Sequence, residues 1–145
     1  ADSAGELTLN SADPNDQPRL DFHYFESEWD RQRMREAIHL SLQILEHPSF
    51  KSLIERRISP TDDDVANDDA LDTWLRQNTA TTQHTSGTCK MGPESDPMAV
   101  VDQSCRVRGL QNLRVVDLSI CPNVVRANTN ATAIVIAERA ASWIS

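Results

Sequence analysis

The chain has 145 residues, enough for one ordinary domain with its own core, and it carries 14 basic and 22 acidic side chains, a formal net charge of −8. This balance argues against nucleic acid as a partner, because nucleic-acid binding needs clustered lysine and arginine. No apolar run approaches the ~20 residues of a membrane segment, and no secretory leader is visible at the start. We therefore expect a soluble acidic protein, with the cytoplasm as its compartment.

The first 25 residues predict a pair of strands. Residues 5–12 and 19–25 alternate apolar and polar side chains, as half-buried strands do. Between them lies Asp-Pro-Asn-Asp (13–16), which has the composition of a turn. The two runs are predicted to pair in one antiparallel sheet.

The next segments have helical periodicity. From Glu28 to His47 apolar side chains recur at steps of three and four residues, and Pro48 ends the pattern. The acids between 61 and 72 lack the alternating positions and the central glycine of a calcium loop. They are better placed at the start of a helix over about 68–78, where they stabilise its positive end. No metal site is predicted.

The last third predicts short strands and one apolar helix. Strands are expected at 100–101, 105–108 and 113–117, with a turn at 109–112. A helix is expected from about 130 to 143, and because most of its positions are apolar it should be buried on most sides within a larger body. The cysteines are odd in number and form no Cys-x-x-Cys, so they are predicted to be core or near-core residues rather than disulfides or zinc ligands: Cys89, Cys105 and Cys121.

Three short motifs carry the chemistry of the chain. His84 opens His-Thr-Ser-Gly-Thr-Cys-Lys-Met-Gly, Asp117 lies in Leu-Arg-Val-Val-Asp-Leu-Ser, and Asn128 opens Asn-Thr-Asn-Ala-Thr-Ala. An imidazole titrates near pH ~6.5 and can act as a base, whereas an amide offers a donor and an acceptor without ionising. Taken singly, these residues have ordinary roles: a surface or core histidine, a turn residue and a helix cap. Taken together, they indicate a redox site built around a bound cofactor.

In this order the motifs resemble the C-terminal region of the glucose–methanol–choline (GMC) flavoenzyme oxidoreductases. The separation of His84 and Asn128, 128 − 84 = 44 positions, also suits the family pattern. The resemblance implies oxidation of an alcohol to a carbonyl by hydride transfer to N5 of FAD. The histidine that matches His84 would act as the base, and the residue that matches Asn128 would orient the substrate oxygen.

The resemblance also implies the cofactor contacts. Asp117 and Leu118 match an acid and the following backbone near the ribityl and pyrophosphate portion of FAD. Asn128, Thr129 and Thr132 match the start of the last helix, which in the family points at the pyrimidine edge of the flavin. Free N–H groups at that helix end would stabilise the anionic reduced flavin.

The implied fold is α+β, divided at residue 110. Residues 1–110 would form part of a substrate-binding domain, an antiparallel or mixed sheet that carries helices and the His84 loop. Residues 111–145 would supply a strand and a helix that complete a Rossmann-like FAD-binding domain. Because the sequence contains no Gly-x-Gly-x-x-Gly, we interpret the chain as a C-terminal portion. It would need an N-terminal FAD-binding portion, in cis or as a separate chain, together with a small alcohol substrate.

Three alternatives remain open on the same scaffold. They are a hydroxynitrile lyase, a fatty-acid photodecarboxylase and a non-catalytic fragment. The pairing of His84 with Asn128 favours redox chemistry over the two other enzymes.

Overall fold

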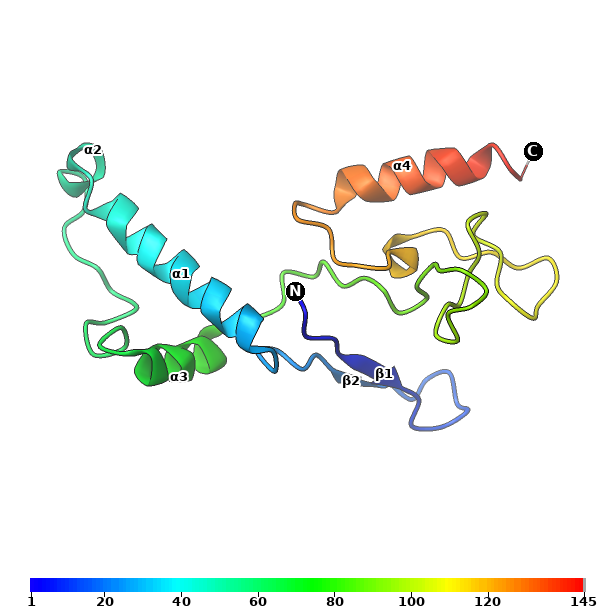
Figure 1. Cartoon of the computed structure of the whole chain (residues 1–145), viewed down its shortest axis with the longest axis horizontal. Helices are drawn as coiled ribbons and strands as arrows, with labels where there is room; N and C mark the ends of the chain where they lie inside the picture. The colour runs from blue at the N-terminus through cyan, green and yellow to red at the C-terminus, as the bar shows by residue number, and fades with distance from the viewer. Residues whose placement is uncertain (145) are drawn as a thin grey trace. The chain divides into compact units, whose positions relative to one another are not determined.

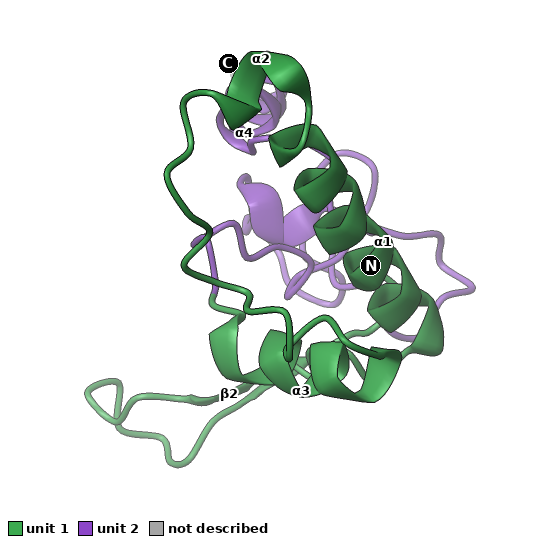
Figure 2. Ribbon diagram, turned by 90° about the vertical axis from the view of Figure 1, so that its left-hand side faces the viewer, with its two compact units in different colours: residues 1–80 green, residues 81–145 purple. Residues whose placement is uncertain are grey.

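The computed structural model describes residues 1–144 of the chain (Figure 1). Its elements are, in order, β1 (Glu6–Thr8), β2 (Arg19–Asp21), α1 (Glu28–Leu45), α2 (Pro48–Lys51), α3 (Asp68–Asn78), the one-turn 3-10 helix η1 (Leu118–Ile120) and α4 (Asn130–Ala141). They fall into two compact units, which Figure 2 colours separately: unit 1, Ala1–Ala80, and unit 2, Thr81–Ser145. The division predicted at residue 110 concerns the larger protein and stays a prediction.

The predicted antiparallel pairing of the first two strands is confirmed, over shorter stretches. β1 and β2 pair with Leu7 opposite Leu20. β2 ends early because His23 and Phe25 have φ values of 47° and 64°, outside the region that a strand requires. At the other end the backbones approach closely, since a Cβ on Gly5 would lie 2.1 Å from the carbonyl oxygen of Asp21. This two-stranded antiparallel sheet, together with the helices, is the part of the expected α+β fold that the described residues show.

The two predicted helices of unit 1 are confirmed. α1 ends before Pro48, as predicted. Pro48 is the first residue of α2, a position at which a helix does not use the backbone N–H that proline lacks. α3 spans the predicted residues, and the side chain of Asn67 caps it by accepting from the Ala70 N–H at 2.9 Å. Leu71 and Leu75 on α3 are buried and form the core of this unit.

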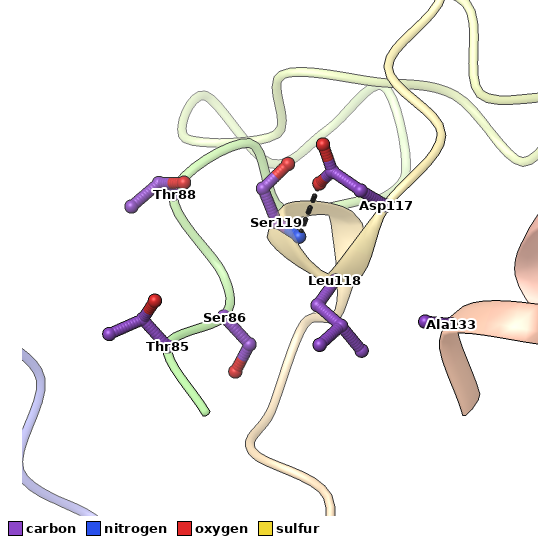
Figure 3. Close-up of a pocket in the computed structure, with 7 residues that line it drawn as sticks. All are labelled: Thr85, Ser86, Thr88, Asp117, Leu118, Ser119 and Ala133. Atoms are coloured by element: carbon purple, nitrogen blue, oxygen red, sulfur yellow. Dashed lines mark hydrogen bonds between the residues drawn. The ribbon is translucent and has the colours of Figure 1, made fainter. Parts of the chain in front are cut away.

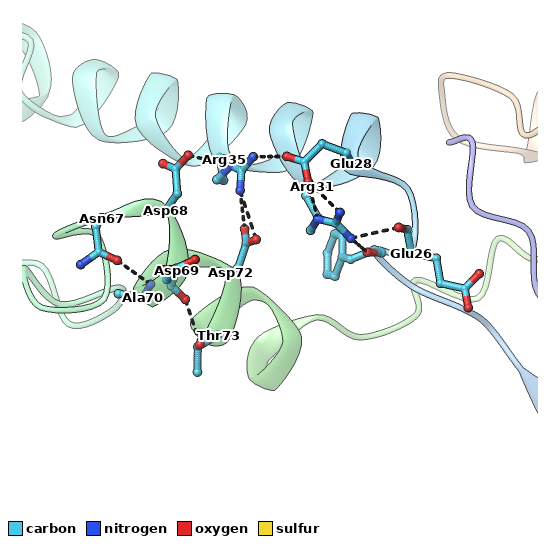
Figure 4. Close-up of polar contacts among 11 residues, drawn as sticks. Glu26, Glu28, Arg31, Arg35, Asn67, Asp68, Asp69, Ala70, Asp72 and Thr73 are labelled. Atoms are coloured by element: carbon cyan, nitrogen blue, oxygen red, sulfur yellow. Dashed lines mark hydrogen bonds and ion pairs between the residues drawn. The ribbon is translucent and has the colours of Figure 1, made fainter.

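An arginine on α1 joins that helix to α3 (Figure 4). Arg35 Nη1 donates to both carboxylate oxygens of Asp72 at 3.1 Å, and its Nη2 donates to Glu28 at 2.6 Å. The side chains of Arg35 and Asp72 are only 14% and 12% exposed. Because the two helices bury few apolar side chains, this network is a main connection between them.

Unit 2 has a small core and little regular structure. Val101, Cys105 and Ile120 form its buried cluster, against which half-buried aliphatic side chains pack. The prediction of strands at 100–108 and 113–117 is wrong: the segments make isolated bridges, such as Arg106 opposite Arg114, rather than continuous ladders. Their aliphatic residues pack into the core, and a strand forms only where a partner offers a matching edge over several residues.

The cysteines occupy the predicted environments. Cys105 and Cys121 are buried, Cys89 is half-buried, and all three are free thiols. Burial raises the pKa of the Cys105 thiol, which disfavours the reactive thiolate. A role as small core residues accounts for these observations.

The apolar helix α4 begins where predicted, and its burial within a larger body stays a prediction. Ala140 is the one residue of α4 that is buried, whereas Ile134 and Val135 are 53% and 66% exposed. Within unit 2, that side of the helix is left exposed. None of the described helices is long and apolar enough to cross a membrane.

Candidate functional site

The loop that begins at His84 lies alongside η1. The N–H groups of Gly87, Cys89 and Met91 donate to the carbonyls of Leu118, Ser119 and Ile120 at 3.3, 2.9 and 2.8 Å, respectively. Alternate residues of the loop are thus held by successive residues of the turn. Two motifs some 30 positions apart in the sequence are thereby placed side by side.

His84 is half-buried in this loop, and its orientation is set by a neighbour. Its Nδ1 lies 2.9 Å from the hydroxyl oxygen of Thr82. Gly87 follows with a φ of 87°, a conformation that only glycine adopts easily, and a Cβ there would lie 3.3 Å from the carbonyl oxygen of Cys121. The glycine of the motif therefore permits the bend that brings the loop against η1.

Asp117 ends no strand, contrary to the prediction, but caps η1. Its Oδ1 accepts from the N–H of Ser119 at 2.7 Å, and the side chain remains exposed. The strand fails to form because the segment before it makes only the single bridge described above. The carboxylate still stands where the His84 loop meets the turn.

These two segments and the start of α4 enclose a hollow of about 320 Å³ (Figure 3). Its lining residues come from all three motifs: Thr85, Ser86, Thr88, Asp117, Leu118, Ser119 and Ala133. Of the residues predicted to contact a cofactor, Asp117 and Leu118 line this hollow. Sequence reasoning missed Ser86 and Ser119, although both lie within the motifs.

Two of the lining hydroxyls have unmet hydrogen-bonding capacity. The Oγ atoms of Ser86 and Ser119 are buried and have no partner among the described residues. Buried polar groups are nearly always hydrogen-bonded in native structures, so each such atom needs an explanation. Neither Oγ atom has accessible surface in the hollow, so the polar groups that the lining presents are those of Thr85, Thr88 and Asp117.

The remaining predicted site residues cluster at the start of α4. Thr129 is the buried N-cap residue, with 7% of its surface exposed, and its carbonyl accepts from the Ala133 N–H at 2.9 Å. Asn128, just before it, is exposed, and Thr132 is half-buried. His84 and Asn128 are not among the residues that line the hollow, so their pairing stays a prediction.

A second hollow in unit 2, of about 590 Å³, is lined by charged side chains of both signs. Arg106 and Arg108 line it together with Glu94 and Asp102, so opposite charges offset one another. None of the predicted site residues reaches it. Within the described part of the chain, no group of three or more histidine, cysteine or acidic side chains is arranged to hold a metal ion.

Comparison with known proteins decides the family. The model of the GMC oxidoreductase family matches residues 1–137. The chain belongs to this family. An oxygen-dependent choline dehydrogenase from Photobacterium profundum is 41% identical over 142 residues, which cover 98% of this chain and 25% of that protein.

Solved GMC structures have the same fold over nearly the whole chain. Pyridoxine 4-oxidase from Mesorbium loti matches 96% of it with a TM-score of 0.88 and 32% identity. An FAD-dependent oxidoreductase from Chaetomium thermophilum matches 97% of it with a TM-score of 0.88 and 28% identity. The matches cover 26% and 24% of those chains, so this GMC chain spans about a quarter of the length of its relatives.

The hollow of this GMC chain fits part of an FAD molecule. FAD is rich in hydroxyl and phosphate oxygens, and the exposed hydroxyls of Thr85 and Thr88 on the lining could pair with such atoms. The first turn of α4, which carries free backbone N–H groups, lies at the rim through Ala133. The fit rests on these donors and not on the family name alone.

Proposed function

We propose that this chain carries the catalytic base of an FAD-dependent alcohol oxidoreductase and acts together with an FAD-binding portion, in cis or as a separate chain. The observation that carries the proposal is the hollow between the His84 loop and η1, with its polar lining of Thr85, Thr88 and Asp117. Membership of the GMC family supports it. Choline is the first alcohol to test, because relatives 41–44% identical to this chain are named oxygen-dependent choline dehydrogenases.

His84 would take the proton of the substrate hydroxyl. If Nδ1–H donates to Thr82, the lone pair of the ring is on Nε2, which can then accept that proton. Asn128 would hold the substrate oxygen without competing for the proton, since an amide does not ionise. FAD, when bound, would supply the acceptor for the hydride.

The cofactor would be held from two sides. Asp117 and Leu118 would contact it from η1, and Asn128, Thr129 and Thr132 from the start of α4. The partial positive charge of that helix end would favour a negatively charged flavin. These assignments belong to the proposal.

The test is His84→Ala in the complete holoenzyme, with flavin bleaching followed anaerobically after mixing with choline and a panel of other alcohols. Loss of a general base should slow flavin reduction by roughly 100-fold or more. His39→Ala, an exposed histidine on α1, is the matched control and should reduce at the wild-type rate. Unchanged reduction in His84→Ala would exclude the histidine as the base.

The same experiment separates the other GMC chemistries. A hydroxynitrile lyase or a photodecarboxylase would show no alcohol-dependent bleaching even in the wild-type protein. A non-catalytic role would give the same result and, in addition, no turnover with either of their substrates. Bleaching by any alcohol therefore favours the proposed oxidoreductase.

A further inference from the structure

We propose that Gln83 is a positioning residue of the proposed active site, whose left-handed backbone makes the bend that directs His84 toward the substrate. The inference rests on the proposed function, because it takes His84 as the base that meets the alcohol. The contact with Thr82 holds the imidazole ring, whereas Gln83 sets the direction in which the backbone presents it. The glutamine side chain has no part in the chemistry.

The first argument is the backbone conformation of Gln83. Its φ is 62°, in the left-handed region where the Cβ of an ordinary residue crowds the following carbonyl oxygen. Glycine, asparagine and aspartate adopt this conformation readily, and glutamine is not one of them. Such a conformation persists only where the surrounding contacts require it, and residues of this kind cluster at functional sites.

The second argument is that the bend is held on both sides of Gln83. The N–H of Gln83 donates to Oγ1 of Thr81 at 3.0 Å. Across the bend, Oγ1 of Thr82 lies 2.9 Å from Nδ1 of His84. A return of φ to the ordinary negative range would rotate the chain after Gln83 by on the order of 120° and separate the imidazole from Thr82. The direction of His84 therefore depends on the φ of the residue before it.

The third argument is that the glutamine side chain has no other task. Gln83 is exposed, and its side-chain amide takes part in no hydrogen bond within residues 1–144. The bend instead begins the segment 84–86, which ends at Gly87, a second left-handed residue with a φ of 87°. Thr85 and Ser86 of this segment line the hollow (Figure 3). The two bends thus place His84 and the lining together.

The first experiment tests the left-handed backbone without any reaction. At most positions alanine stabilises a protein relative to glycine, because it has less conformational freedom in the unfolded chain, but at a left-handed position this order reverses. In the complete protein, Gln83→Gly should therefore unfold at a higher temperature than Gln83→Ala, as followed by circular dichroism. The opposite order would overturn the inference.

The second experiment measures the rate constant of flavin reduction per bound flavin, in the complete holoenzyme mixed anaerobically with the best alcohol of the panel. Gln83→Val has a branched Cβ, which the left-handed backbone tolerates least. It should lower the rate constant at saturating alcohol by roughly 10- to 100-fold, the cost of misplacing a catalytic group. The alcohol concentration that gives half the maximal rate should change little. Gln83→Asn tolerates the conformation and should restore most of the rate.

Two controls separate the position of the base from the chemistry of the side chain. Gln83→Ala removes the amide as valine does, but it lacks the branched Cβ and should reduce its flavin much faster than the valine variant. Ser95→Val places the same side chain on an exposed turn outside the left-handed region and should behave like the wild type. A loss as large in Gln83→Ala as in Gln83→Val would assign the effect to the amide and overturn the inference.

The outcomes distinguish this inference from the proposed function. If His84→Ala reduces its flavin at the wild-type rate, both fail. If His84→Ala is slow and Gln83→Val is not, only the role of Gln83 fails. A valine variant that does not fold, or that folds and holds no flavin, would also overturn the inference, because the bend would then serve the fold or the cofactor rather than the histidine.

Discussion

At the scale of single residues, the orientation of His84 depends on one contact. The Thr82 hydroxyl lies 2.9 Å from Nδ1, and both residues belong to a loop without regular hydrogen bonds of its own. A hydroxyl can donate to Nδ1 or accept from it, so the contact holds the orientation of the ring and not its tautomer. With Nδ1 held by Thr82, Nε2 is the nitrogen left to face the substrate. Thr82 is therefore a positioning residue in the proposed site.

Replacing Thr82 tests this role. In the holoenzyme, Thr82→Val should lower kcat by roughly tenfold, the value of one hydrogen bond at the transition state, with little change in KM. Thr82→Ser keeps the hydroxyl and should restore most of kcat. Steady-state kinetics with the best alcohol of the panel provide the measurement. A valine variant with the wild-type kcat, or a serine variant as slow as the valine variant, would contradict the role of the hydrogen bond.

Sequence reasoning selects candidate site residues where residue type alone suggests chemistry. His84 stands out because an imidazole lies inside a long motif, and Asp117 because an acid follows an aliphatic run. Ser86 and Ser119 gave no comparable signal, since serines are common and their shared position on the lining of one hollow is not visible in the sequence. That property arises only when two distant segments pair.

At the scale of elements, ion pairs carry much of the link between α1 and α3, so their protonation should affect stability. The pKa of the Glu28 carboxyl is held below its usual value near 4.5 by hydrogen bonds from Arg31 and Arg35. A lowered pKa in the folded state contributes stability above the unfolded pKa, and this contribution is lost as the pH falls through the folded pKa. Because the Glu28 side chain is 64% exposed, solvent screens the effect and it should be small.

Glu28→Gln should therefore lower the unfolding temperature slightly near neutral pH and not at strongly acid pH. Thermal unfolding followed by circular dichroism, from about pH 3 to pH 7, measures the difference from wild type. Glu36→Gln is the control, since Glu36 lies on the same helix but accepts from Gln32 instead of an arginine. A difference that persists unchanged below about pH 4 would contradict the proposed ionic origin.

Elements with strong local periodicity were predictable, and those that depend on distant partners were not. α3 follows from its cap and its apolar spacing, and Leu71 and Leu75 are buried as that spacing requires. The segments 105–108 and 113–117 have the composition of strands but form only isolated bridges. Composition favours an extended backbone, whereas a ladder needs a partner whose register the local sequence does not specify.

At the scale of the whole molecule, the chain exposes apolar side chains that a complete protein would cover. On α4, Ile134 and Val135 are more than half exposed, as is Ile144 beyond its end. The sequence predicted that this helix is buried within a larger body, and the relatives are about four times as long as this chain. The exposed side of α4 is therefore the surface on which we expect the FAD-binding portion to pack.

A charge introduced on that surface should leave the folding of this chain unchanged and impair its packing against the FAD-binding portion. Val135→Glu places a carboxylate at a position that is 66% exposed in this chain, so the chain should keep its helix content and unfolding temperature. In the complete protein the same change would bury an unpaired charge, which is strongly destabilising, and the flavin content after purification should fall sharply. Glu138→Ala, an exposed polar position on α4, is the matched control and should retain flavin. Full flavin content in Val135→Glu would mean that this side of α4 stays in contact with solvent, and the FAD-binding portion would have to pack elsewhere on the chain.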